Sequence, residues 1–212
     1  MKGLVLTDIH EDEETARIYV DSEKPDFVLD CGDHERIRNL FGTIPHFYIQ
    51  GNHEPDKIIY EVIEGRPLPN LIYPGQVITL KVGSDQFSFS GIGGNYSARG
   101  GKGNVEKFAI DMLSNIPSTG LDVLLVHESP LDVESTIAER SGALNVLNEI
   151  KRIEPICMFA GHVGTYQKQK TDSGIIVYRL PDVLKGYGLL FISNDEISFS
   201  FKESHHFGNK PK

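Results

Sequence analysis

The sequence predicts an α/β (α+β) fold with both parallel and antiparallel strands, and three patterns carry this prediction. Over the first sixty or so residues, short apolar runs alternate with an amphipathic stretch, which is typical of strand–helix–strand units with parallel pairing. In the middle of the chain, two alternating segments flank a short polar turn and indicate a hairpin. Near the end, two more apolar segments around Asn194-Asp195 indicate a closing antiparallel hairpin.

The first elements follow from apolar periodicity. Residues 12–22 predict a helix, because acidic side chains in its first turn complement the positive end of the helix dipole. The strands expected around it are residues 3–7, 26–30 and 46–50, and the first hairpin joins 76–82 to 86–92.

The second half of the chain also alternates strands with helices. Helices are expected at 105–115 and 142–152. The strands expected in this half are 121–126, 155–160, 174–180, 187–193 and 196–202. The sequence contains no internal repeat and no linker, so we expect a single domain over residues 1–202 and a polar tail at 203–212.

Composition narrows the class of protein. The 212 residues include 30 acidic and 21 basic side chains, a formal net charge of −9, which disfavours long nucleic acid as a partner because clustered Lys and Arg usually bind phosphate backbones. The two cysteines, Cys31 and Cys157, are expected to be buried fillers in a reducing cytoplasm. No signal peptide is visible, and no apolar stretch approaches the roughly 20 residues that span a bilayer, so we expect no membrane association.

Histidines gather at the ends of the expected strands. Those that come immediately after an apolar run are His10, His34, His53, His127 and His162. In open α/β sheets, the loops at the carboxyl ends of the strands form the crevice where ligands bind. The sequence therefore predicts that separate strands deliver metal-competent side chains to one rim.

The neighbours of these histidines add further ligands for a divalent ion. Asp8 and His10 are two positions apart, so both can point into one site with Ile9 turned away. Asp33 and Asn52 follow at later strand ends. Carboxylate, imidazole and amide oxygen together favour Mn, Fe or Zn over an ion that prefers thiolates. The glycines that directly precede candidate ligands, and would let the backbone turn sharply, are Gly32, Gly51 and Gly161.

An ordered set of motifs runs through these segments. D-x-H, GD, GNHE, a lone histidine after an apolar strand, and GH follow one another over residues 8 to 162, each at an expected strand end. This set resembles the calcineurin-like metallophosphoesterases. The resemblance implies a four-layer sandwich in which two mixed β-sheets, flanked by helices, pack face to face.

The resemblance also implies a dinuclear metal centre. The implied ligands are Asp8 and His10 on a first ion, Asp33 between the two ions, and Asn52, His127 and His162 on the second. Two divalent ions beside two carboxylates leave a local charge of roughly +2, which attracts a small phosphorylated substrate such as a nucleotide although the chain is acidic.

The reaction that the resemblance implies is hydrolysis of a phosphomonoester or phosphodiester. A metal-activated water attacks phosphorus in line with the leaving group. His53 does not bind metal in this scheme; it lies near the substrate and assists the leaving group, and Glu54 orients it.

One position departs from the family pattern. The final motif is usually GH-x-H, but here it is GHVG, and Gly164 stands where the second histidine would bind the first ion. That ion would keep three protein ligands and an open position. We therefore expect either a weak first site or a site whose free space holds a substrate group.

For several polar residues, both a structural role and a role in the site remain open. His34 and His46 are expected to be structural, although His34 could reach the site. The glycine-rich loop 91–104 could close over substrate or could simply be a flexible connection. The side chains left equally open are Asn95, Arg99 and Lys102 in that loop and Arg36 and Arg38 after the GD turn, while His205 and His206 are expected to be tail residues.

Two other functions compete with the small-molecule phosphoesterase. A nuclease is disfavoured by the acidic balance. The second alternative is a catalytically weakened binding or scaffold protein. The loss of a metal ligand at Gly164 is the kind of change from which such a protein would arise, but the retention of His53 argues against this function.

Overall fold

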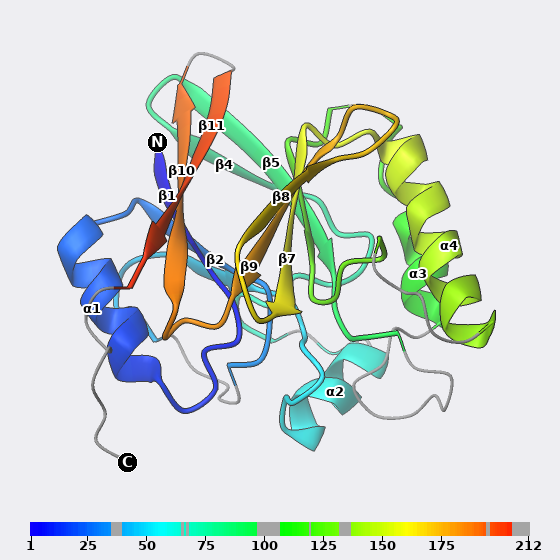
Figure 1. The fold of residues 1–212 in the computed structure, drawn as a ribbon, viewed down its shortest axis with the longest axis horizontal. Helices are drawn as coiled ribbons and strands as arrows, with labels where there is room; N and C mark the ends of the chain where they lie inside the picture. Colours follow the sequence, from blue (N-terminus) through cyan, green and yellow to red (C-terminus); the bar gives the residue numbers. More distant parts are fainter. Residues whose placement is uncertain are drawn as a thin grey trace.

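Two β-sheets pack face to face in the computed structural model, with helices on their outer sides (Figure 1). The structure describes residues 1–34, 40–64, 66, 68–96, 107–118, 120–131, 137–193 and 196–204. Sheet A has the strand order β11-β10-β1-β2-β3, and sheet B has the order β4-β5-β6-β7-β9-β8.

The strands of sheet A are β1 (Lys2–Leu6), β2 (Phe27–Asp30), β3 (His46–Tyr48), β10 (Gly186–Ser193) and β11 (Glu196–Glu203). The strands of sheet B are β4 (Ile78–Val82), β5 (Asp85–Ile92), β6 (Val123–Val126), β7 (Cys157–Val163), β8 (Gln167–Lys170) and β9 (Ile176–Pro181). The helices are α1 (Glu13–Glu23), α2 (Asp56–Ile63), α3 (Lys107–Leu113) and α4 (Ile137–Ile153).

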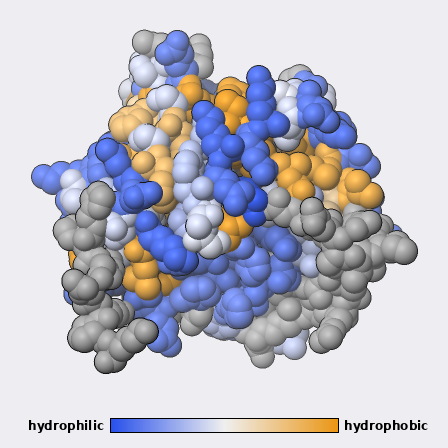
Figure 2. All heavy atoms as spheres, in the orientation of Figure 1, coloured by the Kyte–Doolittle hydropathy of each residue, from blue (hydrophilic) through white to orange (hydrophobic). Residues whose placement is uncertain are grey.

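Both sheets are mixed. In sheet A, β1, β2 and β3 run parallel, and β10 pairs antiparallel with both β1 and β11. In sheet B, β5, β6, β7 and β9 run parallel, and β4 and β8 are antiparallel at the edges. The tip of β7 points toward the side of the molecule where α2 lies, and hydrophilic residues fill the area beyond it (Figures 1 and 2). The carboxyl ends of the parallel strands are where ligands usually bind in such sheets.

The core between the sheets is aromatic. Phe27, Phe87, Phe89 and Phe159 are almost completely buried there, and the ring centroids of Phe27 and Phe87 lie 5.5 Å apart. Burying such a side chain stabilises the fold by about 1.5–3 kcal/mol.

Helices complete the outer layers of the sandwich. Tyr19 and Val20 of α1 pack on sheet A, and Leu113 of α3 and Val146 of α4 pack on sheet B (Figure 1). The four-layer arrangement predicted from the sequence is therefore confirmed. No described helix is both long and apolar enough to cross a membrane.

The expected strands and hairpins are present, with ends displaced by a few residues. Two elements were not predicted. The helix α2 follows the GNHE motif, where Ile58, Ile59 and Val62 have helical spacing that could have indicated it. The strand β8 has the sequence QKQK with every residue exposed, so it carries no apolar signal. The predicted turn at 194–195 lies outside the described residues.

Candidate metal centre

Side chains from both sheets meet where the parallel strands end. The ligand atoms of Asp8, Asp33, His127 and His162 all lie within 4.8 Å of one another. Asp8 follows β1, Asp33 follows β2 and His127 follows β6, whereas His162 lies within β7. The structure thus brings together side chains that the sequence placed at four separate strand ends.

Three of these side chains, those of Asp8, Asp33 and His162, line one open cavity of about 360 Å³. The residues around it are Asp8, His10, Asp12, Asp33, His53, His162, Val163, Gly164, Asp182, Leu184 and Lys185. Ile9 is fully buried and points away from the cavity, as the sequence predicted.

His127 is oriented so that one ring nitrogen is committed to the backbone. Its Nδ1 lies 2.8 Å from the carbonyl oxygen of Cys31, which calls for an N–H at Nδ1. Its Nε2 then carries a lone pair and faces two oxygens, Asn52 Oδ1 at 2.8 Å and Asp33 Oδ2 at 3.5 Å. A lone pair facing two oxygen atoms is unfavourable unless a cation lies between them, so His127 fits a metal ligand held by a backbone carbonyl.

The two carboxylate oxygens of Asp33 have different roles: one accepts a backbone hydrogen bond, and the other faces the candidate metal site. Its Oδ1 accepts a 2.7 Å hydrogen bond from the backbone N–H of His53. Its Oδ2 is buried, accepts no hydrogen bond from the described residues, and lies 4.0 Å from Nε2 of His10. A carboxylate with one unsatisfied oxygen between two imidazoles fits a metal ligand.

Asp8 and His162 are held together across the two sheets. Asp8 Oδ2 accepts hydrogen bonds from Thr7 Oγ1 and, at 3.0 Å, from the backbone N–H of His162. The pairing of β7 with β9 shifts register between Ala160 and Val163, so His162 lies at an irregularity of the strand. Such irregularities redirect side chains, which explains how a residue inside a strand reaches the cavity.

Several candidate ligands have left-handed backbone angles. The φ values are 50° at Asp8, 47° at His10, 64° at Asp33 and 58° at His162. Each such residue costs on the order of 1–3 kcal/mol, so the surrounding structure must hold it in place. Backbone hydrogen bonds do so here, from Asp8 N to the oxygen of Gly32 at 2.9 Å and from His10 N to the oxygen of Asp33 at 2.7 Å.

The glycines before the ligands are required mainly by close packing. A Cβ at Gly51 would overlap Asp33 Oδ1, and a Cβ at Gly161 would overlap Thr7 Oγ1. Gly32 needs both space and conformation, because its φ is +99° and a Cβ there would lie 2.6 Å from the backbone nitrogen of Gly51. Sharp turns were predicted at these glycines, but at Gly51 and Gly161 the close approach of a neighbouring chain segment excludes a Cβ.

The rim of the cavity is more exposed than its floor. The rings of His10 and His53 meet edge to face with centroids 5.6 Å apart, and the side chain of His10 is 38% exposed. Gly164 lines the same cavity, and a Cβ there would meet nothing within 4 Å. Asp182 and Lys185 complete the wall near Gly164, with Lys185 Nζ 2.7 Å from Asp182 Oδ2. Neither residue was predicted from the sequence, although Asp182 directly follows the end of β9.

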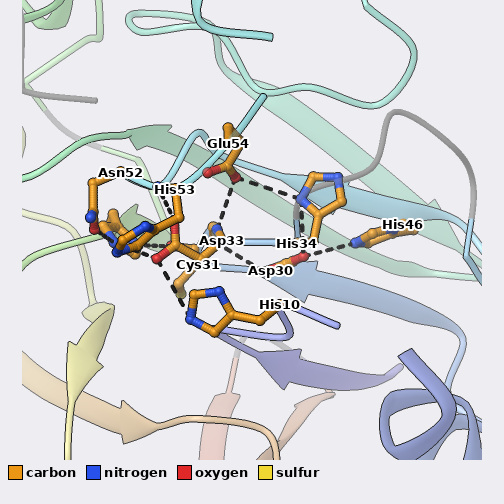
Figure 3. A network of polar contacts seen from close by, with 11 residues as sticks. His10, Asp30, Cys31, Asp33, His34, His46, Asn52, His53 and Glu54 are labelled. Atoms are coloured by element: carbon orange, nitrogen blue, oxygen red, sulfur yellow. Dashed lines mark hydrogen bonds and ion pairs between the residues drawn. The ribbon is translucent and has the colours of Figure 1, made fainter. Parts of the chain in front are cut away.

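Glu54 does not contact His53 in the way the sequence suggested. Its Oε1 accepts a 2.8 Å hydrogen bond from the backbone N–H of Asp33, so Glu54 supports the GD turn (Figure 3). Burial, and then the Asp33 carboxylate, raise the pKa of Glu54 well above its usual value.

His34 and His46 are buried and do not line the cavity, in agreement with a structural role. Both cysteines are free and buried, as expected. Asn95 is half-buried. The other residues of uncertain role, Arg36, Arg38, Arg99, Lys102, His205 and His206, lie outside the described residues.

Known proteins share this architecture. A family model described as calcineurin-like phosphoesterase matches residues 1–194. GAP50, "the anchor in the inner membrane complex of Plasmodium", is 12% identical with a TM-score of 0.65, over 97% of this chain and 85% of that chain. A dimetal phosphatase from Danio rerio is 10% identical with a TM-score of 0.63, over 96% of each chain.

A 5'-nucleotidase from Candida albicans SC5314 is 14% identical with a TM-score of 0.52, over 95% of this chain and 51% of that chain. At these identities the solved structures show a shared fold. No curated protein matches the sequence.

Proposed function

The chain belongs to the calcineurin-like phosphoesterase family of hydrolases, which act on phosphoester bonds, and we propose that it hydrolyses a small phosphomonoester or phosphodiester with two divalent metal ions. The observation that carries this proposal is the convergence of Asp8, Asp33, His127 and His162 within 4.8 Å at a cavity that His10 and His53 also line.

The residues present fit such ions. Asp33 Oδ2 has no hydrogen-bond partner among the described residues and lies 3.5 Å from His127 Nε2, and Asn52 Oδ1 lies 2.8 Å from the same nitrogen. We assign His10 and Asp8 to the first ion, Asn52, His127 and His162 to the second, and Asp33 to both. When bound, the ions would be Mn, Fe or Zn and would activate a water and polarise the phosphoryl oxygens.

His53 is the residue that we assign to the leaving group. It is exposed at the rim, next to His10, where a substrate phosphate can reach it. Its backbone N–H is fixed by Asp33, so the ring is carried by the same turn that supports the candidate metal site. A protonated imidazole there would stabilise the developing charge or protonate the leaving alkoxide.

The size of the cavity supports a small substrate. About 360 Å³ accommodates a phosphate ester, and a similar fold in a 5'-nucleotidase supports nucleotides as candidates. The net charge of −9 supports exclusion of long nucleic acid. Two buried, free cysteines support a reducing, cytoplasmic setting.

The presence of Gly164 favours a second candidate function, that of a binding or scaffold module. The open space at this position would weaken the first ion site, and a weakened enzyme could act as a binding or scaffold module.

The test is hydrolysis of a chromogenic phosphomonoester and a chromogenic phosphodiester with added manganese. We expect metal-stimulated turnover on at least one substrate. In His53→Ala, we expect a loss of about 100-fold or more at unchanged metal content, because a positioned proton donor contributes about that much.

Gln169→Ala provides a control, because Gln169 is exposed on β8 and outside the cavity. Absence of metal-stimulated turnover on both substrates would favour the scaffold. Full activity of His53→Ala would remove the role given to His53.

A further inference from the structure

Four buried ionisable side chains form one cluster that ends at Asp33. Asp30, His34, His46 and Glu54 each have a side-chain or residue exposure of 1% or less. Figure 3 shows them as a continuous row of polar contacts that leads from His46 through Asp30 and His34 to Glu54 and on to Asp33. Buried ionisable groups are costly unless they support one another, so this row invites a functional explanation.

The two carboxylates in the row hold the backbone of the GD turn. Asp30 Oδ1 accepts a 2.9 Å hydrogen bond from the N–H of Gly32. Glu54 Oε1 accepts a 2.8 Å hydrogen bond from the N–H of Asp33. The φ of Asp33 is +64°, so the direction of its carboxylate depends on how firmly these neighbours hold the turn.

His34 lies between those two carboxylates. Its Nδ1 is 3.7 Å from Asp30 Oδ2 and 3.7 Å from Glu54 Oε1, the oxygen that also holds the N–H of Asp33. The ring packs edge to face against Tyr48, with centroids 4.2 Å apart, which fixes its orientation. Two buried acidic side chains disfavour each other's ionised form, and an imidazole placed between them, at ion-pair distances longer than a hydrogen bond, offsets that effect.

We propose that His34 is a positioning residue for metal binding: it joins Asp30 to Glu54, fixes the Gly32–Asp33 turn, and so directs the Asp33 carboxylate into the cavity. This assignment rests on the proposed metal site. It goes beyond the structural role expected from the sequence, because it separates His34 from the equally buried His46.

His46 is the matched comparison. Its Nε2 lies 3.3 Å from the same oxygen of Asp30, but its other described neighbours are the rings of Phe41, Tyr48 and His34. Unlike His34, it has no contact with Glu54 among the described residues, and it reaches the turn only through Asp30. Loss of His46 should therefore affect the stability of the fold more than the affinity of the metal site.

The experiment measures Mn²⁺ affinity by calorimetric titration of the metal-free protein, at a temperature where thermal melts in EDTA show every variant to be folded. We expect His34→Leu to weaken Mn²⁺ binding by about 10- to 100-fold, the range seen when groups that orient ligands are removed. His34→Asn places an amide N–H near the position of Nδ1 and should keep the affinity within a few-fold. His46→Leu should also keep the Mn²⁺ affinity within a few-fold, even if it lowers the melting temperature more than His34→Leu does.

Each outcome is decisive. If the unaltered protein binds no Mn²⁺, the proposed function fails first. If it binds Mn²⁺ and His34→Leu binds equally well, or if His46→Leu loses as much affinity as His34→Leu, the positioning role is wrong. Should His34→Leu not fold, His34→Asn is compared with His34→Gln, whose amide reaches past Nδ1; equal Mn²⁺ affinity of these two would overturn the proposal.

Discussion

The two halves of the candidate metal centre differ in how firmly their side chains are held. In the closed half, formed by Asp33, Asn52 and His127, backbone groups hold Asp33 Oδ1 and His127 Nδ1, and His127 is fully buried. In the open half, formed by Asp8, His10 and Gly164, Asp8 is held by hydrogen bonds, but the His10 side chain is 38% exposed and a Cβ at Gly164 would meet nothing within 4 Å. The comparison teaches that the fold sets one half in advance, whereas the other half leaves room for substrate or solvent to complete it.

The largest effect is expected in the closed half. Asp33→Asn keeps the size of the side chain but removes the charge that faces His127 and His10. We expect manganese-stimulated turnover to fall by about 1000-fold or more, because this carboxylate serves both proposed ions. Steady-state kinetics and metal analysis measure the loss. Activity within tenfold of the unaltered protein would show that the closed half is not the catalytic one.

The buried floor beneath the closed half predicts a pH dependence. Burial raises the pKa of Asp30 to about 7 and lowers the pKa of His46 to about 3. Between pH 4 and 6.5 the folded pair then holds one proton, on Asp30, and the unfolded pair also holds one, on His46. The pair therefore contributes little pH dependence of stability in this range.

In His46→Gln, only the raised pKa of Asp30 remains. A raised carboxyl pKa gives stability that is present at low pH and is lost as the pH rises through the folded value. Relative to the unaltered metal-free protein, the free energy of unfolding of the variant should fall between about pH 4 and pH 7, by up to about 4 kcal/mol. Urea titrations across this range measure the difference; parallel curves would contradict the assignment of the proton.

Glycines offer a matched test of the two halves. A Cβ at Gly51 would overlap Asp33 Oδ1, whereas a Cβ at Gly164 would meet nothing. We expect Gly51→Ala to lower turnover by about 100-fold through displacement of Asp33, and Gly164→Ala to change it little. Equal losses in the two variants would mean that the halves do not differ in packing.

The smallest expected effect is a gain of metal affinity in the open half. Gly164→His would add the ligand that the family pattern contains, and a Cβ at this position meets nothing within 4 Å. We expect the weaker of two Mn²⁺ affinities to improve by about tenfold, in the range by which single groups around a metal change its affinity. If calorimetry finds two tight sites in the unaltered protein and no change in Gly164→His, the first site is not weak.

Much of the fold could be predicted because local patterns of apolar residues mark its strands and helices. Buried parallel strands such as Val123–Val126 are continuous apolar runs, and the carboxyl ends of such strands are where the candidate ligands occur. The strand β8 could not be predicted, because all of its exposed residues are polar and its place depends on pairing with β9. Sheet pairing of this kind is decided by the tertiary structure.

The site was predictable at its ligands and less so around them. Asp8, Asp33, His127 and His162 stand in motifs, whereas Asp182 and Lys185 reach the cavity only through the path of the loop after β9. The hydrogen bond from Asp33 to Glu54, and the place of His34 beside it, depend on the contact between two loops, which a sequence pattern does not show.

Because the candidate ligands come from both sheets, the site also reports on folding. Asp8 Oδ2 and the N–H of His162 are separated by 154 residues, and their hydrogen bond requires sheets A and B to be in place together. An ion that binds only this assembled state would add its binding free energy to the stability of the whole sandwich, about 2.7 kcal/mol at a free concentration of 100 times its dissociation constant. During refolding, the rate at which metal-binding ability appears would then measure the rate at which the two sheets dock.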